Sequence, residues 1–173
     1  LNTRKYSQVK KVSSEGLMAM SIAEDNQKRV WLVTYPRNEL FSYSSSEGLK
    51  DRGTPTPASE AWDHYPRTIA ADDSGWVYFG SGVKQSQIYA YNPTNNQFIT
   101  MLPENQRTAQ SSGEIVRSGN TVYARNNGKV YTALRGVLTS STASMPKGPV
   151  IGTYGTIIYT APSGRSFSSI NMI

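Results

Sequence analysis

The chain has 173 residues, of which 37% are hydrophobic and 17% charged, with 14 Gly and 9 Pro; this balance suits short strands joined by tight turns and excludes a helical bundle. It contains no cysteine, which excludes disulfides, thiolate metal sites and thiol catalysis. The net charge is +6, and residues 101–173 carry 7 Lys and Arg against 2 Asp and Glu.

The charge and the ends of the chain bear on location and partners. A basic excess favours an anionic partner, such as an acidic polysaccharide or nucleic acid, and its alternative is a solvated basic surface without a ligand. No apolar run approaches the roughly 20 residues that span a bilayer, so we expect no membrane segment. The chain starts at Leu1 without a Met, which suggests processing and is compatible with export. We therefore expect an extracellular or periplasmic protein.

Four apolar, aromatic-rich runs recur along the chain and predict equivalent strands. They are residues 29–35, 76–80, 121–125 and 156–160. Their anchors, Val30, Val77, Val122 and Ile157, are spaced 47, 45 and 35 residues apart. The first two spacings match the period of a propeller blade.

The flanks of these runs repeat as well. In the middle unit, residues 67–71 lead through the turn at 72–75 into the anchor run, and residues 88–91 and 97–101 follow. Aromatic residues alternate in the strand after the anchor, which places one set of side chains on each face of a sheet. Residues 67–101 are therefore predicted to form a complete four-stranded antiparallel meander.

Such a meander cannot bury both of its faces alone, and radial stacking of meanders gives a β-propeller. We predict an all-β chain, 1–173 forming a single propeller domain or propeller segment. Its blades are expected at about 13–55, 65–103, 112–142 and 147–173, with an orphan outer strand at 6–9. Closed propellers have about four to eight blades. About three and a half to four are visible here, which favours a segment of a larger ring, with the remaining blades on another chain segment, over a small irregular ring.

The middle unit also resembles known propeller blades. Residues 72–80 read Asp-Asp-Ser-Gly-Trp-Val-Tyr-Phe-Gly, and residues 87–98 continue with Ile-Tyr-Ala-Tyr-Asn-Pro after a Gln. This resembles blades of the quinoprotein-like and kelch-like superfamilies, which often run D-x-x-G-x-V-Y-x-G into Y-x-Y-[DN]-P. The chain lacks the Gly-Gly doublet of kelch, and its Trp62-Asp63 pair lies in a linker, unlike that of WD40 blades. The resemblance implies an architecture and no particular activity.

One linker concentrates chemically varied side chains ahead of the inner strand of the middle blade. Its candidate residues are Trp62, Asp63, His64, Tyr65 and Arg67. Loops that enter inner strands line one mouth of a propeller channel, where ligands usually bind. We predict catalytic roles for His64, Tyr65 and Arg67, and substrate-binding roles for Trp62 and Asp63. The alternative is that the aromatic side chains pack between blades and His64 bonds the backbone.

The composition of this linker looks like that of propeller enzymes that cleave uronic-acid polysaccharides by β-elimination. Arg67 would hold the substrate carboxylate while His64 or Tyr65 exchanges the proton. We therefore predict a module that binds an acidic polysaccharide, with lyase activity as its enzymatic form. The alternative is a non-catalytic scaffold for a protein or glycan partner. Nucleic acid ranks third because the basic residues are scattered.

No cofactor or metal site is predicted. Residues 72–75 offer oxygen atoms to a calcium ion, but a hairpin turn explains them without one. No glycine-rich phosphate loop, nucleophile elbow or zinc-binding helix motif occurs. Nucleotide and serine-hydrolase chemistry are therefore not expected.

Overall fold

The computed structural model describes residues 11–146, 150–153, 156–160 and 167–172, without the side chains of 61–63 and of 150 onward. The strand predicted at 6–9 lies outside the described residues. Apart from two short 3-10 helices, η1 (Ala58–Asp63) and η2 (Glu104–Gln106), the regular structure described is all strand.

Three four-stranded antiparallel sheets follow one another along the chain, each with its strands in sequence order. Blade 1 contains β1 (Met18–Glu24), β2 (Val30–Tyr35), β3 (Glu39–Ser44) and β4 (Gly48–Asp51). Blade 2 contains β5 (His64–Ala71), β6 (Val77–Val83), β7 (Gln87–Asn92) and β8 (Gln97–Thr100). Blade 3 contains β9 (Glu114–Ser118), β10 (Thr121–Asn126), β11 (Lys129–Leu134) and β12 (Val137–Ser141). A three-stranded sheet of β13 (Val150–Thr153), β14 (Thr156–Thr160) and β15 (Phe167–Met172) follows.

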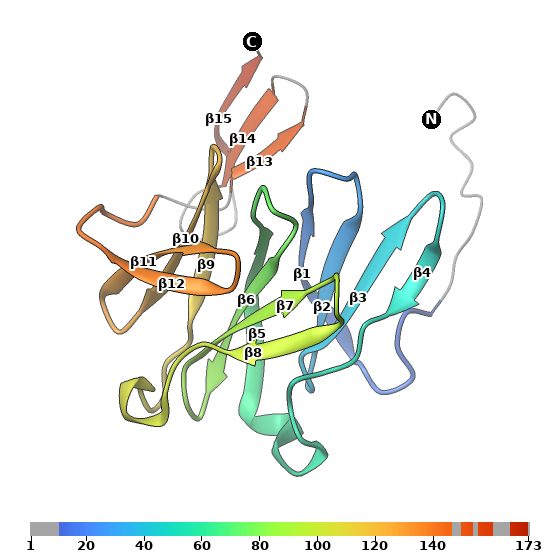
Figure 1. Cartoon of the computed structure of the whole chain (residues 1–173), viewed down its shortest axis with the longest axis vertical. Helices are drawn as coiled ribbons and strands as arrows, with labels where there is room; N and C mark the ends of the chain where they lie inside the picture. The colour runs from blue at the N-terminus through green and yellow to red at the C-terminus, as the bar shows by residue number, and fades with distance from the viewer. Residues whose placement is uncertain (1–10, 147–149, 154–155, 161–166, 173) are drawn as a thin grey trace.

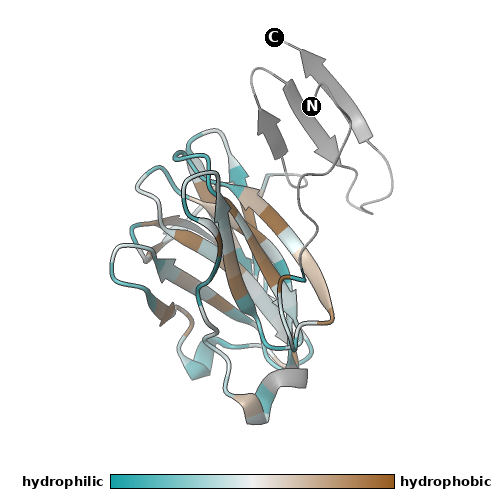
Figure 2. Ribbon diagram, turned by 90° about the vertical axis from the view of Figure 1, so that its right-hand side faces the viewer, coloured by the Kyte–Doolittle hydropathy of each residue, from teal (hydrophilic) through white to brown (hydrophobic). Residues whose placement is uncertain are grey.

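The blades are stacked side by side like the blades of a fan (Figure 1). The first strand of each sheet is innermost, and β5 contacts β1 of blade 1 and β9 of blade 3. One apolar core fills the space between blades 1 and 2, and a second core fills the space between blades 2 and 3. Figure 2 shows hydrophobic stretches along the stacked strands and hydrophilic residues at the turns.

Blade 2 lies between two neighbours, which explains its sequence. Val77, Tyr78 and Phe79 are successive residues of β6 and are all 0% exposed. Val77 and Phe79 belong to the core shared with blade 1, and Tyr78 to the core shared with blade 3. A strand covered on both faces reads as a continuous apolar run. The predicted stacking of four-stranded meanders is thus confirmed.

An aspartate organises the turn after the inner strand in blades 1 and 2. Asp72 Oδ1 accepts hydrogen bonds from the backbone N–H groups of Ser74 and Trp76, at 2.9 and 3.0 Å. Asp25 Oδ1 accepts from the N–H groups of Gln27 and Arg29, at 2.8 and 3.0 Å. Protein donors therefore engage both carboxylates, and residues 72–75 form the predicted hairpin turn.

The buried Asp25 makes the stability of the fold depend on pH. Burial alone raises the pKa of its carboxyl, but hydrogen bonds from Trp31 and Arg29 and the charge of Arg29 hold the pKa below its ordinary value of 3.8. A carboxyl whose pKa is lower in the folded state than in the unfolded state stabilises the fold at a pH above its unfolded-state pKa. That contribution is lost as the pH falls through the folded-state pKa. We expect the stability difference between the wild type and Asp25→Asn to narrow from about pH 5 to about pH 3 in urea unfolding. A constant difference would contradict this assignment.

Candidate functional site

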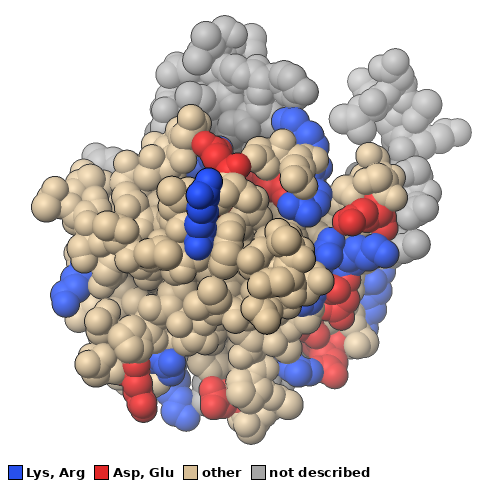
Figure 3. Space-filling view, viewed as in Figure 1, with Lys and Arg blue, Asp and Glu red and all other residues tan. Residues whose placement is uncertain are grey.

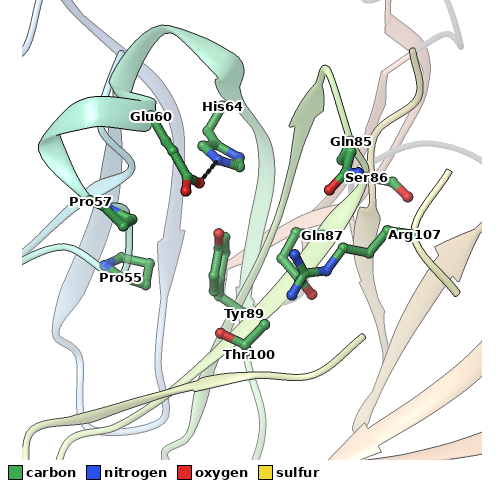
Figure 4. Close-up of a pocket in the computed structure, with 10 residues that line it drawn as sticks. All are labelled: Pro55, Pro57, Glu60, His64, Gln85, Ser86, Gln87, Tyr89, Thr100 and Arg107. Atoms are coloured by element: carbon green, nitrogen blue, oxygen red, sulfur yellow. Dashed lines mark hydrogen bonds and ion pairs between the residues drawn. The ribbon is translucent and has the colours of Figure 1, made fainter. Parts of the chain in front are cut away.

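Three connections between strands meet at the edge of blade 2 where β5 begins. They are the β4–β5 linker that contains η1, the β6–β7 turn and the β8–β9 connection. Adjacent strands of a blade run in opposite directions, so these connections all leave the same edge. They border a cavity of about 150 Å³ beside blade 2, lined by side chains that include Glu60, His64, Gln87, Tyr89 and Arg107 (Figure 4).

His64 is the titratable residue at the start of β5. It is 9% exposed, and its Nε2 lies 3.1 Å from Oε2 of Glu60 on η1. Its Nδ1 is buried and has no hydrogen-bond partner in the structure. If Nε2 donates to the Glu60 carboxylate, Nδ1 carries a free lone pair that can accept a proton or a hydrogen bond. Leaving a buried polar atom without a partner is costly, so this nitrogen is suited to a ligand.

Tyr89 extends from β7 toward the same cavity (Figure 4). Burial raises the pKa of its phenol, while a hydrogen bond with Thr56 and the charge of Arg107 act in the opposite direction. The phenol therefore stays protonated at neutral pH and can donate a hydrogen bond.

Arg107 supplies a cation to the cavity from the β8–β9 connection. Its Nε donates to the carbonyl of Leu102 at 3.2 Å, and Gln87 Nε2 donates to the same carbonyl at 3.2 Å. These bonds fix the connection against β7 and position the guanidinium. The cavity therefore combines an imidazole, a carboxylate, a neutral phenol and a guanidinium.

The site residues predicted from the linker sequence lie in two separate places in the structure. Successive side chains of a strand leave on opposite sides. His64 lines the cavity, whereas Tyr65 stacks on Tyr35 of blade 1, with ring centroids 3.8 Å apart and an interplanar angle of 25°. The guanidinium of Arg67 lies 5.4 Å from the centre of the Tyr65 ring. The backbone of Trp62 and Asp63 lies in η1, but their side chains fall outside the described residues.

Sequence reasoning missed Glu60, Tyr89 and Arg107. Tyr89 belongs to the core between blades 1 and 2 and lines the cavity as well, and the other two lie in connections without a motif. The signal that could have found them is positional. In a meander with strands in order, the residues entering the first strand and those leaving the fourth reach the same edge.

Two features are absent from the described part of the chain. No group of three or more His, Asp or Glu side chains there is arranged to hold a metal ion. None of its helices is long and apolar enough to cross a membrane.

The stacked four-stranded sheets, with their inner strands side by side, define β-propeller architecture. Similar solved structures include a virginiamycin B lyase from Staphylococcus aureus, in a catalytically inactive His-to-Ala form with quinupristin, at 15% identity and a TM-score of 0.54 over 92% of this chain and 57% of that chain. A gluconolactonase from Xanthomonas campestris matches at 13% identity and a TM-score of 0.51 over 83% and 56% of the two chains. A chain of the Mitotic Checkpoint Complex matches at 8% identity and a TM-score of 0.51 over 97% and 57%.

These similarities concern the fold. The chain spans just over half the length of each of these proteins. One of the three belongs to a multiprotein complex, and two are enzymes of different reaction classes. No family model and no curated protein matches the sequence.

Proposed function

We propose that this chain supplies blades of a propeller that binds an acidic polysaccharide outside the cytoplasm and cleaves it by β-elimination. The observation that carries the proposal is the pairing of two features at the start of β5. The cavity holds His64 against Glu60, and the next residue, Tyr65, forms an aromatic stack with Tyr35 beside Arg67.

The stack has the chemistry of a binding site for a charged sugar. Tyr35 and Tyr65 are partly exposed and Arg67 is exposed. An aromatic face packs against the C–H face of a pyranose ring, and a guanidinium matches a carboxylate with two parallel hydrogen bonds. Acidic and basic side chains are interspersed on the face shown in Figure 3, so Arg67 and Arg107 would act locally while the net charge of +6 attracts the polyanion.

The cavity has the groups that an elimination requires. A base removes the proton from the carbon that bears the uronate carboxylate, and its electron pair forms a C=C bond as the glycosidic C–O bond breaks. His64 would accept that proton while Glu60 orients the ring, and Arg107 would hold the carboxylate. The neutral Tyr89 phenol would donate a proton to the departing oxygen.

We expect polygalacturonate incubated with the protein to yield unsaturated products that absorb in the ultraviolet, and neutral dextran to yield none. The double variant His64→Ala, Tyr65→Phe should lose at least about a hundredfold in rate, because general acid–base groups contribute about 100- to 10,000-fold. Tyr123→Phe, in β10 of blade 3, is the matched control and should keep the wild-type rate. Full activity in the double variant would remove these residues from the site.

A non-catalytic scaffold for a protein or glycan is the second candidate. It is favoured by the contacts that the Tyr65 ring already makes within the protein, with Tyr35 and with Arg67. This reading expects polygalacturonate or a protein partner to bind without any product. Calorimetric titration with polygalacturonate, run beside the absorbance assay, separates the two candidates.

A further inference from the structure

The cavity at the start of β5 has room for a single sugar ring. Its volume is about 150 Å³. A protein cavity of about this volume accommodates one six-membered ring, whereas pockets for larger ligands measure about 300–1,000 Å³. Tyr89 of β7 and its cross-strand partner Thr100 of β8 lie between two walls, with Pro55 and Pro57 on one side and Arg107 on the other (Figure 4). The size of the ligand therefore depends on whether these walls can move apart.

The wall that carries Arg107 is tied to the start of β7 and the turn before it. Ser86 is 0% exposed; its hydroxyl accepts a hydrogen bond from the N–H of Thr108 at 2.8 Å, and its own N–H donates to the Thr108 carbonyl at 2.9 Å. Gln87 Oε1 accepts from the N–H of Leu102 at 3.0 Å. This wall cannot retreat without leaving buried polar groups unpaired, which is costly.

The opposite wall, in the β4–β5 linker, is held in the same way. Thr56 lies between Pro55 and Pro57 and is 2% exposed. Its hydroxyl accepts a hydrogen bond from Asn38 Nδ2 at 2.9 Å, and Asn38 Oδ1 accepts from the Ser81 hydroxyl of β6 at 3.1 Å. The two prolines restrict the linker further, because their rings fix φ. Both walls are thus fixed, and the cavity is preformed for one ring.

A ring inside a polysaccharide carries sugars at both C1 and C4, on opposite sides of the ring, whereas a terminal ring carries a sugar at one of them. A one-ring cavity between two fixed walls suits the terminal ring. The chemistry of elimination decides which end. The base takes the C5 proton, the C4=C5 bond forms, and the C4–O bond breaks as the phenol protonates the departing oxygen, so the rest of the chain leaves from C4 and C1 is free. Resting on the function proposed above, we propose that the cavity binds the single uronate ring at the reducing end of the chain.

Calorimetric titration with monosaccharides tests the size and charge of the ligand. We expect galacturonate to bind one-to-one, and galactose, which lacks the carboxylate, and galactonate, which lacks the ring, to bind at least about tenfold more weakly. Arg107→Gln should weaken galacturonate binding at least about tenfold, because the guanidinium pairs with the carboxylate. Arg135→Gln, at an exposed position in the outer hairpin of blade 3, is the matched control and should keep the wild-type affinity.

Trigalacturonate tests which ring enters the cavity. Mass spectrometry of the products should show an unsaturated monosaccharide and a saturated disaccharide, because elimination at the reducing-end ring leaves the C4=C5 bond on that ring. Trigalacturonate reduced with borohydride has an open terminal ring, which no longer holds C5 against the base. We expect it to be cleaved about a hundredfold more slowly.

The possible outcomes separate this inference from the proposed function. An unsaturated disaccharide as the main product, or equal rates for the intact and the reduced trisaccharide, would overturn the inference and leave the elimination standing. Equal affinity for galacturonate and galactonate, or for galacturonate in the wild type and Arg107→Gln, would overturn it as well. Galacturonate binding that requires both the ring and Arg107, without any product from trigalacturonate, would overturn the elimination and support the one-ring site.

Discussion

Replacement of Asp72 by alanine is expected to lower the free energy of unfolding by about 3 kcal/mol or more, because it leaves several buried donors without an acceptor. Asp72 is 1% exposed. Its Oδ1 accepts from the turn, and its Oδ2 accepts from the Tyr78 hydroxyl at 2.7 Å and from the backbone N–H of Arg135 in blade 3 at 2.8 Å. Gly136 N–H donates to the same hydroxyl at 2.9 Å. Asp72 therefore joins the inner turn of blade 2 to the outer hairpin of blade 3.

Asp73→Ala is the matched control for this prediction. Asp73 is the exposed neighbour, and its carboxylate pairs with Arg117 at 2.6 Å. An exposed ion pair contributes roughly 0–1 kcal/mol, so this variant should unfold close to the wild type in guanidinium. Hydrogen exchange adds a local readout, since the amides of Arg135 and Gly136 should lose protection only when Asp72 is replaced. Equal losses in the two variants would show that the interblade bonds contribute little.

Replacement of Gly80 by alanine is expected to cost about 3 kcal/mol or more, at the upper end of overpacking penalties, since the methyl group would meet backbone. A Cβ at Gly80 would lie 2.0 Å from the carbonyl oxygen of Gly113. The N–H of Gly113 donates to Ser81 at 3.0 Å, so the β8–β9 connection lies directly against β6. Because this connection also carries Arg107, displacement should weaken the proposed binding of polygalacturonate along with stability.

The variant Gly119→Ala is the control that separates the cost of a steric clash, expected at Gly80, from the cost of an unfavourable backbone conformation. Gly119 has a φ of +59°, and a Cβ there would meet nothing within 4 Å. Its replacement should cost about 1 kcal/mol, the conformational penalty alone. Thermal unfolding of both variants provides the comparison. A Gly80→Ala protein as stable as Gly119→Ala would mean that the connection moves aside freely, and that Arg107 is not held in place by this contact.

Functional positions at the cavity follow from the order of strands in a blade. Glu60 and His64 enter β5, Tyr89 lies in β7, and Arg107 follows β8. The meander brings these segments to one edge, where the β4–β5 linker lines one side of the cavity with Pro55 and Pro57. Residues far apart in sequence thus combine an imidazole, a carboxylate, a phenol and a guanidinium in one place, while the rigid strands fix their spacing.

The sequence by itself determined the repeating unit. The anchors Val30, Val77 and Val122, the alternating aromatics and the Asp-containing turns are local signals, because strand faces and turns depend on near neighbours in the chain. They were sufficient to predict four-stranded meanders and their stacking. They also placed His64 at the entrance of an inner strand.

Only the tertiary structure decided which side chains share a site. Tyr65 and Arg67 lie close to His64 in sequence, yet Tyr65 stacks on Tyr35 and Arg67 lies against the Tyr65 ring, while His64 joins Glu60 in the cavity. The reason is physical: a strand sends successive side chains to opposite sides, and their partners come from other blades. Exposure of Ile22 and Tyr43 also depends on whether a neighbouring blade packs against them, and no local pattern encodes that.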